Sequence, residues 1–241
     1  MAGHSKWANI QHRKARVDAK KAKVFTRILK EITVSARMGG GDPGGNPRLR
    51  QAIQDARAAN IPNDNIDRAI AKGTGDLEGV SYEEIAYEGY GPNGVAVLVE
   101  AVTDNRNRTV AEIRHLFSRH GGNLGENGCV AWMFDRRGFL SFDPASMEEE
   151  DFMALALDLE ADDLDTEGEA YTLFCAPESY HRILDELGAR GIEPQSKDLA
   201  MVPNNTVALE PETYEKVQAF LETLEDHDDV QDVWSNLEEL D

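Results

Sequence analysis

The spacing of apolar residues changes once along this chain, and the change limits the folds open to it. Between residues 24 and 70, apolar side chains recur every three or four positions, which predicts amphipathic helices. From Tyr82 onward, short β-branched runs separated by glycine turns predict strands that alternate with helices. The predicted class is therefore α+β, with a helical bundle before two α/β sandwich domains.

Three helices are expected in the first part of the chain. The first covers residues 24–36, and a glycine-rich turn from Gly39 to Gly45 follows it. Asn46 and Pro47 are typical of the start of a second helix, with proline at the first helical position. Its expected buried face consists of Leu49, Ala52, Ile53 and Ala56. The third helix begins at Asn63 or Asp64, and Gly73 is expected to cap its end.

The next segment alternates between strand and helix patterns. Ile85 to Tyr87 and Val95 to Val102 are predicted strands, and Val130 to Phe134 is predicted to continue the same sheet. Between them, Thr109 and Glu112 have the spacing of a capping box at the start of a helix. A strand, helix and strand form half of a split-βαβ sandwich, whose exposed edges need covering.

The remaining segments complete that sandwich and add another. Residues 138–202 follow the order β-α-β-β-α-β, while residues 206–234 follow the order strand, helix, strand. The latter are expected to pair with the first sheet. We therefore predict a basic arm and helical domain over residues 1–78, followed by two ferredoxin-like α/β sandwich domains. The second domain is discontinuous, at 79–137 and 204–241, and the third is an acidic insert at 138–203.

Charge divides the chain as sharply as periodicity does. The first 72 residues hold fifteen Lys or Arg against six Asp or Glu, whereas the other 169 hold ten against thirty-nine. A concentrated basic segment is typical of phosphate binding, because each cation that neutralises a phosphate releases counterions. The predicted contacts are Lys6, Trp7, Arg13, Lys14, Arg16, Lys20, Lys21, Lys23, Arg27 and Lys30. The alternative is a solvated charged face with Trp7 packed in the core.

A second anion site is predicted at Arg106 and Arg108, which precede the helix expected to start near Thr109. Free N–H groups at a helix N-terminus favour an anion, and two guanidinium groups add to that preference. Alternatively, the two arginines pair with Glu100 or Glu112 in an ordinary turn.

No pattern in the sequence indicates an enzyme. The histidines form no metal-binding pair, no serine or cysteine lies in a nucleophile motif, and no cofactor or metal site is expected. Cys129 and Cys175 are expected to be reduced thiols, which suits the cytoplasm. No apolar run is long enough to cross a membrane. A mitochondrial transit peptide remains the alternative interpretation of the basic start.

Five segments resemble the YebC/PmpR family: residues 1–9, 39–43, 87–92, 103–109 and 121–125. The first reads Met-Ala-Gly-His-Ser-Lys-Trp-Ala-Asn, and the fourth reads Thr-Asp-Asn-Arg-Asn-Arg-Thr. The resemblance implies a three-domain fold and a role as a DNA-binding transcriptional regulator. The alternative that it implies is a role in translation, because a mitochondrial relative activates translation and bacterial relatives resemble ribosome-associated factors that relieve stalling at proline runs. Cys129 departs from the family's usual serine.

The sequence therefore predicts a non-enzymatic, nucleic-acid-binding regulator of gene expression in the cytoplasm. Its partner is DNA or ribosomal RNA on the ribosome, and no membrane or small-molecule substrate is evident. An arm that combines cations with one aromatic suits structured RNA somewhat better than a DNA groove. A protein-interaction adaptor that acts through the acidic domains is the alternative from another class.

Overall fold

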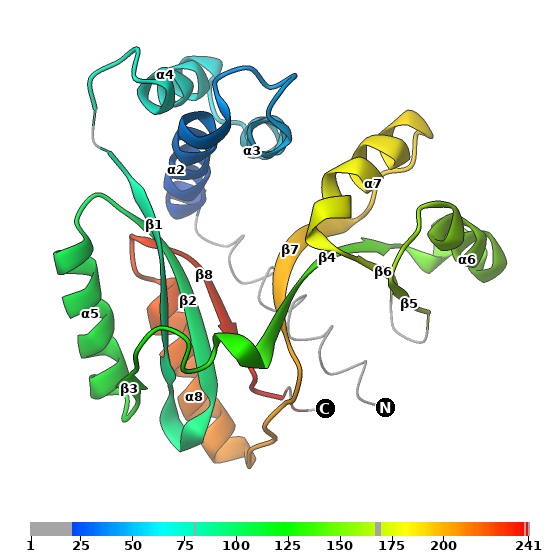
Figure 1. Cartoon of the computed structure of the whole chain (residues 1–241). Helices are drawn as coiled ribbons and strands as arrows, with labels where there is room; N and C mark the ends of the chain where they lie inside the picture. The colour runs from blue at the N-terminus through cyan, green and yellow to red at the C-terminus, as the bar shows by residue number, and fades with distance from the viewer. Residues whose placement is uncertain (1–20, 80, 167–169, 239, 241) are drawn as a thin grey trace. The chain divides into compact units, whose positions relative to one another are not determined.

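The computed structural model describes residues 21–79, 81–166, 170–238 and 240 (Figure 1). Within them the chain forms two compact units. The first unit contains the described residues up to 132 and those from 207 onward, and the second contains those from 133 to 206. The predicted division into three domains stays a prediction.

The first unit begins with three helices, namely α2 (Lys21–Gly39), α3 (Pro47–Ala58) and α4 (Asn63–Thr74). Asn46 caps α3 by accepting a hydrogen bond from the Leu49 amide, and Pro47 takes the first helical position as predicted. The buried face of α3 also consists of the four predicted residues. This face packs against Ile32 and Ala36 of α2 and Ile66 of α4.

Gly73 does not end the third helix. Helix α4 continues to Thr74, and Gly75, with a φ of 86°, takes the left-handed position beyond it. A Cβ on Gly73 would lie 2.4 Å from the carbonyl oxygen of Thr33, so this glycine lets α4 approach α2 closely. The prediction of a cap at Gly73 was wrong because the residue serves helix packing.

The first unit also contains an antiparallel sheet in the order β3-β1-β2-β8 (Figure 1). Its strands are β1 (Glu83–Tyr90), β2 (Ala96–Thr103), β3 (Asn123–Leu124) and β8 (Val230–Ser235), with a 3₁₀ turn at Pro92–Gly94. Helices α5 (Arg106–Arg119) and α8 (Pro211–Glu225) share one apolar core with this sheet. Phe117 and Phe220 meet edge to face in that core, with 5.0 Å between ring centroids.

Pairing of β8 with β2 confirms the expectation that the C-terminal segment joins the first sheet. Val130 to Phe134, however, is not a strand of that sheet. A 3₁₀ turn occupies Ala131–Met133, and Phe134 begins β4 in the other unit. The prediction failed because the backbone of this apolar run turns around a buried carboxylate, that of Glu88. Near the C-terminus, the predicted strand at 206–209 is reduced to a single bridge from Val207 to Leu237.

The second unit has the predicted order β-α-β-β-α-β. Its elements are β4 (Phe134–Phe142), α6 (Glu149–Asp158), β5 (Asp163–Asp165), β6 (Tyr171–Cys175), α7 (Pro177–Ala189) and β7 (Ser196–Pro203), with a 3₁₀ turn at Pro144–Ser146. The strands pair antiparallel in the order β5-β6-β4-β7, which is the ferredoxin-like arrangement. Residues from both helices and from β4 and β6 form its core. None of the described helices in either unit combines the length and apolarity that crossing a bilayer requires.

Candidate nucleic-acid interface

The predicted contacts of the basic arm lie outside the described residues. This applies to Lys6, Trp7, Arg13, Lys14, Arg16 and Lys20. The backbone of Lys21 begins α2, but its side chain is also outside the described part. The structure therefore bears on Lys23, Arg27, Lys30, Arg106 and Arg108 among the predicted residues.

Lys30 was expected on an exposed stripe of the first helix, and this was wrong. Its side chain is buried, with only 7% of the residue exposed. The ammonium donates to the carbonyls of Val102 and Asp228, both at 3.0 Å, and to Asp229 Oδ1 at 2.9 Å. All three ammonium protons therefore have acceptors within the protein. The prediction failed because α2 packs its basic side against β2 and the start of β8.

The neighbouring cations of α2 also contact acceptors within the first unit. Arg27 Nη2 donates to the carbonyl oxygen of Glu225 at 2.5 Å, and Lys23 Nζ lies 3.8 Å from Asp226 Oδ1. Both acceptors belong to the C-terminal end of α8, where unpaired carbonyls give a helix its negative pole. This side of α2 thus attaches the helices to the sheet of the same unit.

Asp229 is the centre of this attachment, and sequence reasoning missed it. Besides Lys30, its carboxylate accepts hydrogen bonds from Arg108 at 2.7 Å, Thr109 at 2.8 Å and Thr103 at 3.2 Å. Burial alone would raise the pKa of Asp229, but the bonds from Arg108, Lys30 and Thr109 hold that pKa well below its ordinary value. The sequence shows only one aspartate among several before a short strand, so no local signal distinguishes it.

The second predicted anion site is displaced by one helical turn. Helix α5 begins at Arg106, and the side chain of Asn105 caps it by accepting from the Arg108 amide at 3.1 Å. Thr109 therefore lies inside the helix, and the predicted capping box with Glu112 was wrong. Asn105 has the stronger capping geometry because its side chain reaches the third residue beyond it.

Arg106 and Arg108 consequently differ in what they can bind. Arg108 contacts Asp104 at 3.0 Å as well as Asp229, so neither Glu100 nor Glu112 is its partner. Arg106 is exposed in the first turn of α5 and forms no ion pair with any described residue. Of the two arginines, Arg106 is the one available to an external anion.

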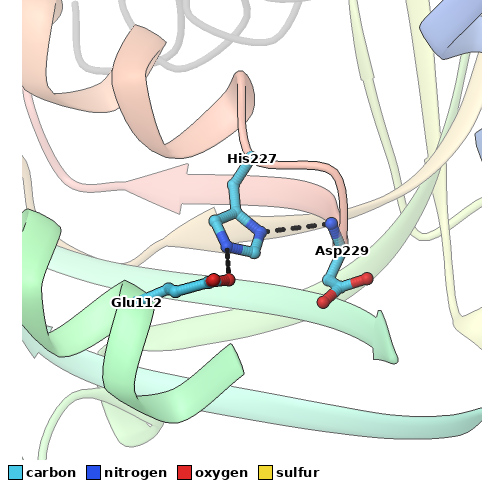
Figure 2. Close-up of side chains that lie close together, drawn as sticks. All are labelled: Glu112, His227 and Asp229. Atoms are coloured by element: carbon cyan, nitrogen blue, oxygen red, sulfur yellow. Dashed lines mark hydrogen bonds and ion pairs between the residues drawn. The ribbon is translucent and has the colours of Figure 1, made fainter. Parts of the chain in front are cut away.

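A histidine extends the network around Asp229 (Figure 2). His227 Nδ1 accepts from the Asp229 amide at 3.1 Å, so its Nε2 carries the proton that faces Glu112 Oε2 at 2.8 Å. Ligand atoms of Glu112, His227 and Asp229 lie within 4.8 Å of one another, close enough for a shared metal ion. However, both Asp229 oxygens and the His227 Nδ1 already have donors, which favours a polar junction between α5 and the turn before β8.

A second buried carboxylate organises the loop that follows β3. Glu88 accepts the amides of Gly128 at 2.7 Å, Val130 at 2.9 Å and Ala131 at 2.7 Å. Burial would raise its pKa, yet these three backbone bonds lower it below the ordinary value. Glu88 therefore stays charged and fixes the course of residues 128–131. Cys129 in this loop and Cys175 are both free thiols, and burial raises the pKa of each.

Comparison with known proteins places this geometry in a family. Residues 5–76 match the N-terminal domain of TACO1/YebC proteins, and residues 82–237 match their second and third domains. A probable transcriptional regulatory protein of Halothermothrix orenii is 53% identical over 99% of this chain and 95% of its own length. One from Natranaerobius thermophilus is 50% identical, with coverage of 99% and 96%.

A solved structure has the same fold. The crystal structure of a conserved hypothetical protein from Aquifex aeolicus superposes with a TM-score of 0.82 at 44% identity. The superposition covers 93% of each chain, so the similarity extends over both compact units.

Proposed function

Because this chain belongs to the TACO1/YebC family, we propose that it is a nucleic-acid-binding regulator of gene expression without enzymatic activity. Its relatives named as probable transcriptional regulatory proteins support the regulatory role. The proposal places the protein in the cytoplasm, acting without a cofactor. The nucleic acid is DNA, or ribosomal RNA if the protein acts in translation.

The observation that carries the proposal is that some basic residues bind acceptors within the protein, whereas others are exposed. Lys23, Arg27 and Lys30 bind acceptors in the body of the protein, so they hold the helices in place. The proposed contacts with an external polyanion are therefore the basic residues of the arm, together with exposed cations of the first unit. These exposed residues are Arg37, Arg57, Arg68, Lys72, Arg106, Arg114 and Arg119. The proposed contacts of the arm are Lys6, Trp7, Arg13, Lys14, Arg16, Lys20 and Lys21.

A salt titration of nucleic-acid binding tests the proposal. The triple variant Arg13→Ala, Lys14→Ala, Arg16→Ala should bind RNA and DNA less tightly than the unchanged protein. The slope of log K against log salt should fall by about 0.7 to 0.9 for each lost phosphate contact. The matched control is Arg136→Ala, Arg190→Ala, Lys216→Ala, which removes three exposed cations elsewhere in the chain. Equal slopes for the two triple variants would reject the arm as the binding site.

Crosslinking in cells separates the two nucleic acids. Bound DNA and RNA are sequenced in parallel from cells that express the unchanged protein or the arm variant. Enrichment at promoters assigns the protein to transcription, and enrichment on ribosomal RNA assigns it to translation. Signal in either pool should decrease for the arm variant.

A protein-interaction adaptor is the second candidate, and the surface of α6 favours it. Met153 and Leu157 are exposed on this helix although both are apolar. The first turn of α6 carries three consecutive carboxylates, Glu149 to Asp151, which would repel nucleic acid. If the adaptor function is correct, replacing Met153 and Leu157 by serine should abolish regulation in a reporter assay while nucleic-acid binding stays unchanged.

A further inference from the structure

Two aromatic side chains from distant parts of the first unit are exposed together. Tyr90 is 39% exposed and Trp132 is 70% exposed, and they are the only aromatics among the exposed large apolar residues of the described chain. Tyr90 Oη donates to the carbonyl of Cys129 at 3.3 Å, and Trp132 Nε1 donates to the same oxygen at 3.1 Å. A single acceptor thus holds the two donor atoms, Tyr90 Oη and Trp132 Nε1, within two hydrogen-bond lengths of each other.

The backbone beneath this aromatic pair is tightly held. Glu88 fixes the amides on both sides of Cys129, as described above. A Cβ on Gly122 would lie 2.6 Å from the carbonyl oxygen of Tyr90, and one on Gly125 would lie 2.5 Å from Cys129 Sγ. Such close packing restricts the loop before any ligand arrives, which lowers the entropic cost of binding.

Tyr90 and Trp132 have few hydrogen-bonding groups left for a partner. Each ring uses its one hydrogen-bond donor on Cys129, so what remains for a partner is the acceptor capacity of Tyr90 Oη and the exposed surfaces of the two rings. Flat aromatic faces that are fixed in place and open to solvent are the means by which proteins stack unpaired bases. Bases inside a duplex are already stacked on their neighbours and cannot reach such a surface.

Charge in this region also suits a nucleic acid. Residues 105–133, which include α5 and the loop, hold four arginines against two glutamates, and one of these arginines, Arg108, is paired with Asp104 and Asp229. By contrast, residues 73–241 as a whole hold ten Lys or Arg against thirty-nine Asp or Glu. Glu88 lies beside the aromatic pair but is 6% exposed, and backbone amides surround its charge. A phosphate backbone therefore meets less repulsion along α5 and this loop than over the rest of the acidic body.

We propose that Tyr90 and Trp132 form a stacking site for an unpaired base of the bound nucleic acid. The inference rests on the proposed function and adds to it a preference for single-stranded or looped segments. It assigns base contact to the α/β part of the first unit and leaves general phosphate attraction to the arm.

The test compares three probes of equal length with the full-length protein: a single-stranded oligonucleotide, its duplex, and an abasic strand that keeps the phosphates. Trp132→Ala and Tyr90→Ala should each weaken binding of the normal single strand roughly 5- to 150-fold. Binding of the duplex and the abasic strand should not change, and neither should the salt slope, because no phosphate contact is lost. Tyr90→Phe keeps the ring and should retain most of the affinity for the single strand.

Leu157→Ala, which removes an exposed apolar side chain from α6, is the control and should bind all three probes normally. Equal single-strand affinity of Trp132→Ala and the unchanged protein would overturn the stacking site and leave the proposed function intact. A uniform loss across the three probes would also overturn it, since stacking cannot explain weaker binding of the abasic strand. If the unchanged protein binds none of the probes, the proposed function itself fails.

Discussion

Lys30 and Asp229, separated by 199 residues in the chain, form a buried ion pair with 2.9 Å between Nζ and Oδ1. The pair connects α2 to the start of β8, and Arg108 and Thr109 connect the same carboxylate to the start of α5. One aspartate therefore joins the helical segment, the sheet and a covering helix of the first unit.

Removing the ammonium of Lys30 should destabilise the protein strongly. Lys30→Met leaves the Asp229 charge buried with one donor fewer and two carbonyls without a partner, which typically costs about 3 to 5 kcal/mol. Urea denaturation of the variant and the unchanged protein measures the difference. Lys216→Met removes a cation from an exposed pair on α8 and should change stability by less than about 1 kcal/mol. Similar losses for both variants would contradict a special role for Lys30.

The same junction predicts how stability depends on pH. The pKa of Asp229 is lower in the folded protein than the unfolded value of about 3.9, so the unfolded chain binds the proton first as the pH falls. The stabilisation is therefore complete above about pH 5 and decreases below about pH 4. Denaturation midpoints of Asp229→Asn and the unchanged protein should accordingly converge between pH 7 and pH 3. A constant difference across that range would show that the Asp229 charge does not contribute.

Neighbouring arginines of α5 should behave differently when each is replaced. Arg108→Ala removes a donor from Asp229 and should lower the denaturation midpoint. Arg106→Ala should leave the midpoint unchanged and reduce the salt slope of nucleic-acid binding by about 0.9, the value for one phosphate contact with duplex DNA. Midpoints and salt slopes measured on both variants give the comparison. If the salt slope of binding changes only in Arg108→Ala, then Arg108 and not Arg106 contacts the phosphate.

Glu88 should control the order of the loop that carries Trp132. Glu88→Ala leaves three backbone amides without their acceptor, and each buried unsatisfied group costs about 1 to 3 kcal/mol. The loop is expected to lose its fixed course, which lowers the fluorescence anisotropy of Trp132. The measurement needs Trp7→Phe and Trp234→Phe in the background, so that Trp132 is the single emitter. Unchanged anisotropy would mean that the loop is held by other contacts.

Replacing each of two helical glycines by alanine should change the stability of the protein in opposite directions. At Gly73 a methyl group would lie 2.4 Å from a backbone oxygen of α2, so Gly73→Ala should separate α2 from α4 and lower stability by about 1 to 3 kcal/mol. Gly188 lies in α7 with open space around it, so Gly188→Ala should raise stability by about 0.5 to 1 kcal/mol. Thermal unfolding of the two variants tests whether the first loses stability and the second gains it.

Local features of the fold could be predicted from the sequence because their causes lie within a few residues. The cap at Asn46, the buried face of α3 and the β-α-β-β-α-β order of the second unit all depend on short-range patterns. Residues 130–134 could not be assigned in this way. Their apolar run resembles a strand, but the acceptor that bends them, Glu88, lies about forty positions earlier.

The candidate site was predicted less well for the same reason. An amphipathic pattern shows which side of α2 is apolar, but it cannot show that a second element covers the polar side as well. Lys30 therefore looked exposed, although its ammonium is buried against the Val102 carbonyl, 72 residues away in the chain, and against Asp228 and Asp229, which are 198 and 199 residues away. Arg106 and Arg108 look equivalent in sequence, and only the position of Asp229 distinguishes them.

The long separation between Lys30 and Asp229 also determines the order in which a growing chain can complete its parts. The second unit has all its strands between residues 134 and 203, so it can fold as soon as that stretch has left the ribosome. The first unit must wait for β8, the last strand made, before its sheet is complete. Until then the Asp226 carboxylate, the Glu225 carbonyl and the Asp229 carboxylate, which contact Lys23, Arg27 and Lys30 respectively, have not been synthesised. A nascent chain therefore presents a larger cationic surface than the finished protein, and synthesis of the final segment covers part of it.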